Sequence, residues 1–194
     1  TESAINDAYQ FFSICAQLVH PQFSLASNLE HVEQICKLVE GMPLAIELAA
    51  SWTHIMSCQQ IAAELKKNVD GLLVSRFHDF PERHRSINMV IDHSWSLLSD
   101  TEKYVLRRLS VSKGGYTQSA VQEVANASFE IMGSLVDKSF VQVNETGRYD
   151  LHEVVRQFAL RKLKENGELK NALDSHGSYF AHFIVSRIPD MKGR

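Results

Sequence analysis

Apolar residues recur at three- and four-residue spacing along most of the chain, which is the pattern of amphipathic helices. The first such segment predicts a helix over residues 4–19 that ends before the pair His20 and Pro21, because a proline disfavours helical backbone in the preceding residue. A second helix, with Asn28 as its N-cap and Gly41 as its C-terminal stop, leads to a third over residues 44–55 that is apolar on most sides. We therefore expect the third helix at the centre of a first core.

Two pairs of residues have the spacing of a capping box, in which a side chain at each end satisfies a free backbone donor of the first helical turn. The pairs are Ser57 with Gln60 and Ser99 with Glu102. Between them, a short apolar segment at 72–74 precedes the stretch 76–85, which contains Pro81 and is dense in charge and histidine. This stretch is the predicted joint between two subdomains, and a helix over 86–98 follows it.

The second half of the chain changes its pattern after two short predicted helices at 117–125 and 128–138. Segments 139–143 and 148–151 then flank the turn Asn144-Glu145-Thr146-Gly147, as in a β-hairpin. Three helices followed by a two-stranded wing are typical of a winged-helix fold. We thus predict a mainly α fold, in which a helical bundle is followed by a winged-helix domain with a small two-stranded wing.

Two further helices are predicted at the C-terminal end. One begins at Glu153 and stops near Gly167, and it closes the winged-helix unit. The last begins near Leu169, is amphipathic, and is predicted to end before Pro189. We interpret it as the start of a further helical region. Because the first residue is Thr1 rather than Met, we expect the chain to be part of a longer polypeptide.

The composition is that of an ordinary globular protein, with 44% hydrophobic and 22% charged residues in a chain of 194. A net charge of −3 gives no overall reason to expect nucleic acid or an acidic membrane as a partner, and no apolar run is long enough to span a bilayer. The three cysteines form no CxxC pair, which favours reduced, buried thiols and a cytoplasmic location.

Sequence motifs of catalysis and phosphate binding are not found. No segment matches GxxxxGK[ST], and no Gly-x-Ser-x-Gly elbow is present. His176 and His182 are six residues apart, which misses the three- or four-residue spacing of metal ligands on one helical face. We predict no catalytic residues, no metal site and no cofactor bound by this chain alone, so the chain by itself is not expected to be an enzyme.

An ordered series of motifs resembles the STAND signal-transduction ATPases, especially the bacterial LuxR-type and AfsR-like regulators of transcription. The helix corner Gly41-Met42-Pro43-Leu44-Ala45 looks like the "GLPLA" corner of that family. The other matches, in chain order, are Phe80-Pro81-Glu82-Arg83, Asp92-His93-Ser94-Trp95, Leu109-Ser110-Val111 with Gly114-Gly115-Tyr116, Leu135-Val136-Asp137-Lys138-Ser139, and Tyr149-Asp150-Leu151-His152-Glu153 with the helix that follows.

The resemblance implies a division into three parts. Residues 1–80 would form the helical lid (ARC-like) subdomain, 81–166 the winged-helix domain, and 167–194 the start of a further helical region. The ATPase core, with its P-loop and Walker B carboxylates, would belong to the same polypeptide outside this chain and would bind ATP or ADP with magnesium. The lid and the winged helix would close over that nucleotide as a non-catalytic switch, and a C-terminal helical-repeat sensor is a further expected partner.

The resemblance also implies a set of nucleotide-contacting residues. Pro43 would pack on the adenine, with Gly41 and Leu44 beside it, and His152 would reach the diphosphate of ADP. Here Leu151-His152-Glu153 stands where related families have Met-His-Asp, and the glutamate leaves the local helix-capping geometry open.

Other interpretations follow from the residues alone. Glycine and proline between helices are common structural punctuation, and a histidine at a strand-to-helix junction can simply cap the helix. Three residues, Arg83, His84 and Arg85, fit either a phosphate sensor or a solvated hinge.

Two other functions are alternatives to the nucleotide switch. One is a winged helix that binds DNA, although residues 99–166 contain ten Lys and Arg against nine Asp and Glu, a net of only +1. Direct DNA contact by this chain is therefore not expected. The other is a scaffold for protein interactions.

Overall fold

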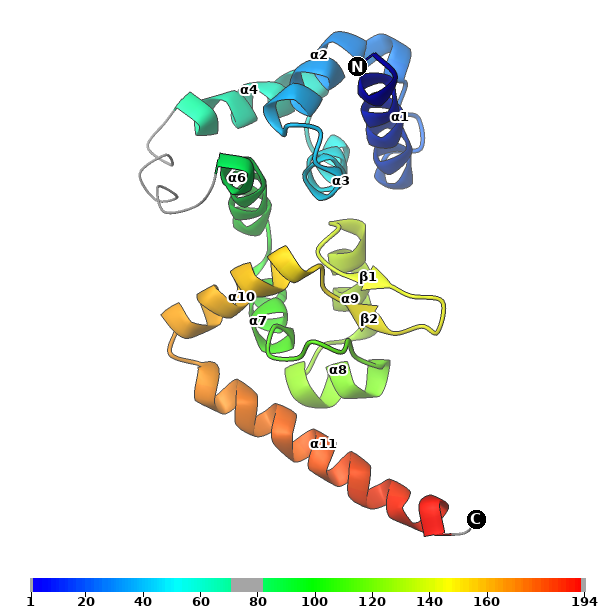
Figure 1. Cartoon of the computed structure of the whole chain (residues 1–194), viewed down its shortest axis with the longest axis vertical. Helices are drawn as coiled ribbons and strands as arrows, with labels where there is room; N and C mark the ends of the chain where they lie inside the picture. The colour runs from blue at the N-terminus through cyan, green and yellow to red at the C-terminus, as the bar shows by residue number, and fades with distance from the viewer. Residues whose placement is uncertain (1, 71–81, 193–194) are drawn as a thin grey trace. The chain divides into compact units, whose positions relative to one another are not determined.

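The computed structural model in Figure 1 describes residues 2–70 and 82–192, and the side chains of residues 6–67 and 86–188. The chain forms two compact units. Unit 1 comprises Thr1–Leu98 with Asp137–Ser139, and unit 2 comprises Ser99–Val136 with Phe140–Arg194. The fold is mainly α with one small antiparallel sheet of two strands among the described residues, which confirms the predicted fold class.

Unit 1 is a helical bundle built around its third helix. Its elements are α1 (Glu2–Val19), α2 (Leu25–Leu38), α3 (Pro43–Ser51), the short 3-10 helix η1 (Trp52–His54), α4 (Cys58–Asp70) and α6 (Glu82–Ser96). α3 packs against α1 and α6, and its residues Ala45, Ile46, Leu48, Ala49 and Ala50 are all buried, as expected of a helix that is apolar on most sides. The predicted apolar segment at 72–74 lies outside the described residues.

Two predicted boundaries in unit 1 are wrong. α2 begins at Leu25, so Asn28 is not its N-cap. The side-chain amide of Asn28 instead donates to the Ser24 carbonyl at 2.9 Å. The chain turns early because Phe23 is anchored in the core against Phe12, with ring centroids 5.9 Å apart.

The third helix, predicted to reach Ile55, ends at Ser51. The hydroxyls of Ser51 and Thr53 bond the carbonyls of Leu48 and Ala50, each at 2.7 Å. Such bonds from hydroxyls to nearby carbonyls compete with continuation of the helix. The chain therefore changes to a 3-10 turn at Trp52.

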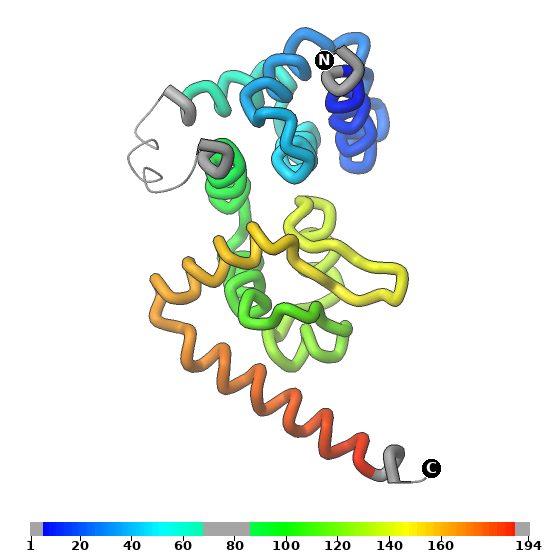
Figure 2. The backbone as a smooth tube through the Cα atoms, in the orientation of Figure 1, coloured from blue at the N-terminus to red at the C-terminus, as the bar shows by residue number. Residues whose placement is uncertain are grey.

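Unit 2 has the predicted order of three helices, a hairpin and two more helices, which can be followed in the tube of Figure 2. Its elements are α7 (Asp100–Leu109), α8 (Gln118–Ala125), α9 (Phe129–Asp137), β1 (Gln142–Val143), β2 (Tyr149–Asp150), α10 (Glu153–Glu165) and α11 (Leu169–Lys192). Gln142 pairs with Asp150 and Val143 with Tyr149, so the strands are shorter than predicted.

The turn of the hairpin is held by a side chain. The Asn144 side-chain oxygen accepts from the backbone amides of Thr146 and Arg148, each at 3.0 Å. These bonds replace the ladder that longer strands would have supplied. Gly115 lies beside the hairpin with a φ of +64°, and a Cβ at that position would come within 2.8 Å of the Tyr149 carbonyl oxygen, so both the backbone conformation and the space require glycine.

The division of the structure differs from the predicted one in two places. α6, which the predicted boundary at 80/81 assigns to the winged helix, packs on α3 and α4 in unit 1. α11, which was expected to start a separate region at 167, packs on α8 in unit 2 and continues through Pro189 to Lys192. A hydrophobic pattern tells which face of a helix will be buried, but not which neighbour buries it, and both differences have this origin.

Candidate functional site

The corner between α2 and α3 is a Schellman motif followed by a proline. Glu40 donates its amide to the Lys37 carbonyl at 3.1 Å, and Gly41 donates to the Cys36 carbonyl at 2.9 Å. Both residues are left-handed, with φ of +54° at Glu40 and +66° at Gly41. The residue that stops the helix in the usual left-handed position is thus Glu40, and Gly41 allows the second left-handed step.

Pro43 follows as the first residue of α3, where a missing amide hydrogen costs nothing because that position has no partner within the helix. Its ring is exposed, whereas Leu44 is only 8% exposed and belongs to the core of unit 1. Of the predicted nucleotide-facing set in this corner, Gly41 and Pro43 therefore lie at the surface and Leu44 lies beneath them. The fixed φ of proline and the bonded turn before it make this a stiff apolar surface.

His152 is the N-cap of α10 in unit 2. Its ring nitrogen Nδ1 accepts the Val154 backbone amide at 3.4 Å, and the side chain is exposed. In the neutral ring, a nitrogen that accepts leaves the proton on the other nitrogen, so Nε2 is the donor that His152 offers to a ligand. The capping role and the predicted ligand role use different atoms, and one does not exclude the other.

Glu153, which stands where related families have aspartate, does not replace His152 as the helix cap and takes a separate structural role. Its two carboxylate oxygens accept from Arg156 at 2.7 and 2.6 Å, and one of them also accepts from Gln157 at 2.8 Å. These hydrogen bonds lower the pKa of Glu153 to about 2. Arg156 in turn donates to the buried Ser110 carbonyl at 3.1 Å, which fastens the start of α10 to the end of α7.

The predicted site residues therefore fall in two groups. Gly41, Pro43 and Leu44 belong to one corner of unit 1, and His152 belongs to unit 2. Arg83, His84 and Arg85 lie in the first turn of α6, and their side chains are outside the described part of the chain.

A polar cluster in the interior of unit 1 was not predicted from the sequence. Trp52 donates its indole hydrogen to the Ser94 hydroxyl at 3.0 Å, and the ring of His93 lies 4.5 Å from the Trp52 ring. Burial lowers the pKa of His93, although Glu64, 3.9 Å from its Nδ1, opposes that shift. His93 and Ser94 belong to the sequence motif Asp92-His93-Ser94-Trp95, but only the packing shows that Ser94 is bonded to a tryptophan 42 residues away.

The surface of α9 bears on the predicted lack of DNA contact. As the third helix of the winged-helix unit, α9 would be the one to enter a DNA groove. Its sequence contains neither lysine nor arginine, and Phe129, Glu130 and Asp137 are exposed on it. Such a surface offers carboxylates to a phosphate backbone, which is unfavourable.

Several arginines of unit 2 are committed to contacts within the unit. Arg107 bonds Glu168, Arg108 bonds Asn171 and the Val124 carbonyl, Arg148 bonds the carbonyls of Gly114 and Gly115, and Arg156 bonds Glu153 and Ser110. An open groove between α8 and α11 also contains the carboxylates of Glu123 and Asp174, and no lysine or arginine is among its lining residues. Unit 2 thus uses these arginines for its own structure.

Within the described residues, no group of three or more His, Cys, Asp or Glu side chains is arranged to hold a metal ion. A search of the same residues for a helix both long and apolar enough to cross a membrane finds none.

Sequence comparison finds curated relatives but no matching family model. The chain is 36% identical over 195 aligned residues to Putative HTH-type transcriptional regulator Rv0890c of Mycobacterium tuberculosis, and equally to Putative HTH-type transcriptional regulator Mb0914c of Mycobacterium bovis. These alignments cover 95% of this chain but only 22% of each relative, so the chain spans about a fifth of their length. The uncharacterized protein Rv0894 of Mycobacterium tuberculosis is also 36% identical, over 86% of this chain and 45% of its own length.

Proposed function

We propose that this chain is a regulatory segment of a larger transcriptional regulator. The observation that carries the proposal is the alignment over 95% of the chain, through both units, with proteins named HTH-type transcriptional regulators. Because the aligned segment is only 22% of those relatives, the segment would act together with other parts of such a protein.

Within that role we infer a finer function, a switch that responds to a bound adenine nucleotide. In this proposal Pro43 packs on the adenine ring and His152 donates its Nε2 hydrogen to the diphosphate, while a separate ATPase core holds most of the nucleotide and its magnesium. Two observations support it: Pro43 is exposed on a stiff corner, and the Nδ1 atom of His152 is already engaged by the backbone.

Approximate energies define how the switch would work. Burying about 50 Å² of apolar area on Pro43 is worth about 1 to 1.5 kcal/mol. A charge-assisted hydrogen bond from His152 adds about 1.5 to 3 kcal/mol. Their sum is below most of the ~4 to 15 kcal/mol cost of association, so the chain alone should not hold nucleotide. Within a complete protein the same contacts would shift a two-state equilibrium by about a hundredfold.

The test measures ADP release from the full-length protein that contains this chain. His152→Ala should release ADP about 10- to 100-fold faster, as expected for the loss of a hydrogen bond to a charged group. Because alanine also removes the helix cap, His152→Asn is the sharper variant, since asparagine can cap α10 but lacks the imidazole. His182→Ala, at an exposed histidine of α11, is the matched control. Release at the wild-type rate from both His152 variants would remove His152 from the proposal.

Pro43 is tested in the same assay by Pro43→Ala, with Pro21→Ala as the control at another exposed proline of unit 1. Loss of the stiff apolar surface should weaken ADP retention about three- to tenfold. Calorimetric titration of ADP into the 194-residue chain itself should give no measurable heat, and micromolar binding there would contradict the division of labour between this chain and an ATPase core.

Direct DNA binding is the second candidate. It is favoured by the relatives' name, HTH-type transcriptional regulator, and by the order α8, α9 and hairpin, which is that of a winged helix. The test is titration of duplex DNA into the chain at low salt. Micromolar binding that weakens steeply with added salt would establish this candidate in place of the switch. The exposed carboxylates of α9 and the committed arginines lead us to expect no such binding.

A further inference from the structure

The junction between α10 and α11 is a short backbone elbow. α10 ends at Glu165, and Gly167 adopts a φ of +71°. Gly167 donates to the Lys164 carbonyl at 3.0 Å and Glu168 to the Leu163 carbonyl at 3.2 Å, which completes the turn. A Cβ on Gly167 would meet nothing within 4 Å, so its backbone conformation rather than close packing calls for glycine. The elbow is thus shaped by its backbone hydrogen bonds, and no side-chain packing at Gly167 adds to them.

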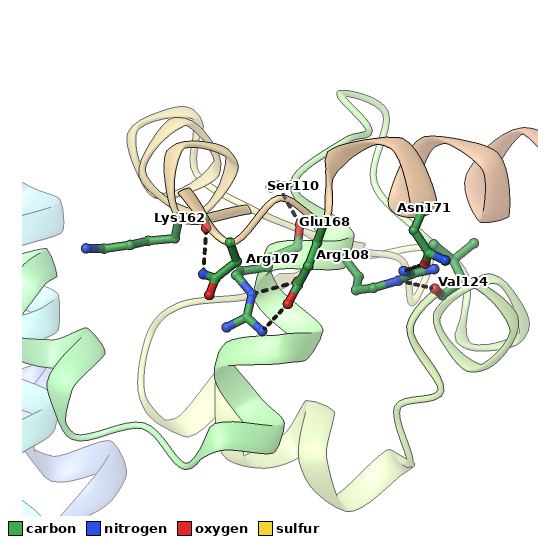
Figure 3. Close-up of polar contacts among 8 residues, drawn as sticks. Arg107, Arg108, Ser110, Val124, Lys162, Glu168 and Asn171 are labelled. Atoms are coloured by element: carbon green, nitrogen blue, oxygen red, sulfur yellow. Dashed lines mark hydrogen bonds and ion pairs between the residues drawn. The ribbon is translucent and has the colours of Figure 1, made fainter. Parts of the chain in front are cut away.

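Two adjacent arginines on the last turn of α7 hold the first turn of α11. Arg107 makes a bidentate contact with Glu168, with its Nε 3.0 Å and its Nη2 3.1 Å from the carboxylate oxygens. Arg108 bonds the Asn171 side chain and, through Nε at 3.0 Å, the Val124 carbonyl of α8. Figure 3 shows the two guanidinium groups diverging from α7 towards these separate partners. We call these contacts the arginine clamp.

The two halves of the clamp differ in their exposure to water. Arg108 is only 5% exposed, whereas the side chains of Arg107 and Glu168 are 14% and 31% exposed. A bidentate arginine–carboxylate pair fixes orientation as well as distance, because both hydrogen bonds must be aligned. The clamp therefore constrains the angle at which α11 leaves the elbow.

Beyond the clamp, contact of α11 with its unit decreases along the helix. Ala172 is fully buried, and the His176 ring lies edge-on to Tyr116 at 6.1 Å. Every residue from 181 to 188 is exposed, including Phe183, Ile184, Val185 and Ile188. The second half of α11 is thus not positioned by packing among the described residues, and its direction depends on the first half.

We propose that α11 is a latched arm, whose direction is set by the arginine clamp and which pivots at Gly167 when the clamp opens. The device does not depend on nucleotide binding. The clamp and the start of α10 are attached to the same end of α7, because Arg156 near the start of α10 donates to the Ser110 carbonyl. One helical turn, residues 107–110, therefore connects the base of the arm to the helix that His152 caps.

The test is a distance measurement between two nitroxide labels on the full 194-residue chain, at Thr101→Cys on α7 and Val185→Cys on α11, both exposed positions. Burial raises the pKa of Cys36 to about 12 and of Cys15 and Cys58 to about 11, so the native thiols should remain unlabelled. The parent chain without the added cysteines checks this.

The doubly labelled chain should give one narrow distance distribution. Adding Glu168→Ala with Asn171→Ala removes the two clamp partners at the base of α11, and leaves Arg108 bonded to α8. It should raise the population of released arms by about 10- to 100-fold, seen as a broad or second distribution. Lys170→Ala, an exposed residue in the same turn, is the control and should leave the distribution unchanged. An unchanged width in the double variant would overturn the proposal, because packing on α8 would then suffice.

A charge swap separates positioning from simple loss of stability. Arg107→Glu alone should release the arm, and Arg107→Glu with Glu168→Arg should restore the narrow distribution by re-forming the ion pair in reverse. If the double alanine variant is unfolded by circular dichroism, this pair of variants decides the question. A swap that stays as broad as Arg107→Glu would contradict a positioning role for Arg107.

Discussion

Trp52 and Ser94 form a buried side-chain hydrogen bond across unit 1, with 3.0 Å between the indole nitrogen and the hydroxyl oxygen. Their exposed fractions are 2% and 3%, so no bulk water competes with the bond. It joins η1 to α6 and thereby ties α6 to the helical bundle. Both tryptophans of the chain, Trp52 and Trp95, belong to unit 1, so tryptophan fluorescence reports the unfolding of that unit.

Ser94→Ala should lower the free energy of unfolding of unit 1 by about 1 to 3 kcal/mol, because it leaves a buried indole donor without a partner. Urea unfolding followed by tryptophan fluorescence measures the change. Ser96→Ala is the control, since the Ser96 hydroxyl bonds the His93 carbonyl at the exposed surface and its loss should cost little. Equal midpoints for the two variants would contradict a stabilising role for the Trp52 contact.

His93 should make unit 1 less stable in mild acid. Burial lowers its pKa in the folded state, and its Nε2 is buried without a partner among the described residues. The folded state then binds fewer protons than the unfolded state, so stability is fully present above the ordinary histidine pKa of about 6.5 and falls as the pH drops below it. The thermal midpoint by fluorescence should decrease between pH 7.5 and 5.5.

His93→Gln should flatten this dependence, because the titrating group is removed. His20→Gln, at an exposed histidine of the same unit, should retain the wild-type slope. A slope in His93→Gln as steep as in the wild type would assign the acid sensitivity to another group.

Two substitutions in the turn after α2 should change the free energy of unfolding differently. Gly41→Ala forces a side chain into a left-handed conformation and should cost about 1 kcal/mol. Glu40→Gly relieves the same strain one residue earlier and should be neutral or stabilising by up to about 1 kcal/mol, after the entropy that glycine adds to the unfolded chain. Urea unfolding of the two variants side by side is the measurement. A loss of stability in Glu40→Gly as large as that in Gly41→Ala would show that side-chain contacts of Glu40 outweigh its backbone strain.

Arg156→Ala should destabilise unit 2 by about 1 to 3 kcal/mol. Arg156 is 8% exposed and its partner Ser110 is fully buried, so truncation leaves a buried carbonyl without this donor. Unit 2 contains no tryptophan, so tryptophan fluorescence does not report its unfolding. Far-UV circular dichroism in urea measures the loss of stability instead. Lys164→Ala, an exposed position on the same helix, should stay within about 0.5 kcal/mol of the wild type. Matching curves for the two variants would mean that the contact with α7 adds nothing to stability.

Local interactions were predictable from the sequence because both partners lie within one helical turn. The Ser57–Gln60 and Ser99–Glu102 boxes form as expected, with the Ser99 amide 2.7 Å from the Glu102 carboxylate. Asn28 shows where a local pattern misleads: its residue type suits an N-cap, but the core position of Phe23 moves the helix start to Leu25.

Contacts between distant residues were not predictable, and these include the polar contacts that organise unit 2. Arg107 and Glu168 are 61 residues apart, and nothing in either local pattern distinguishes them from other charged surface residues. The exposure of Pro43 and of the His152 ring also required the fold, although both residues had been identified by resemblance. Their ligand is still a prediction.

Among the described residues, contacts with unit 2 hold the first half of α11 but not its second half, which indicates where the chain can be shortened. The arginine clamp is complete by Asn171 and the ring contacts with Tyr116 and Phe180 are made by His176. A chain shortened to Phe180 therefore keeps the contacts that seat the helix, and it sheds the four large apolar side chains that residues 181–188 expose to solvent. Such surfaces promote self-association at high protein concentration. Phe180 is thus a suitable last residue for a shortened form of unit 2 that self-associates less.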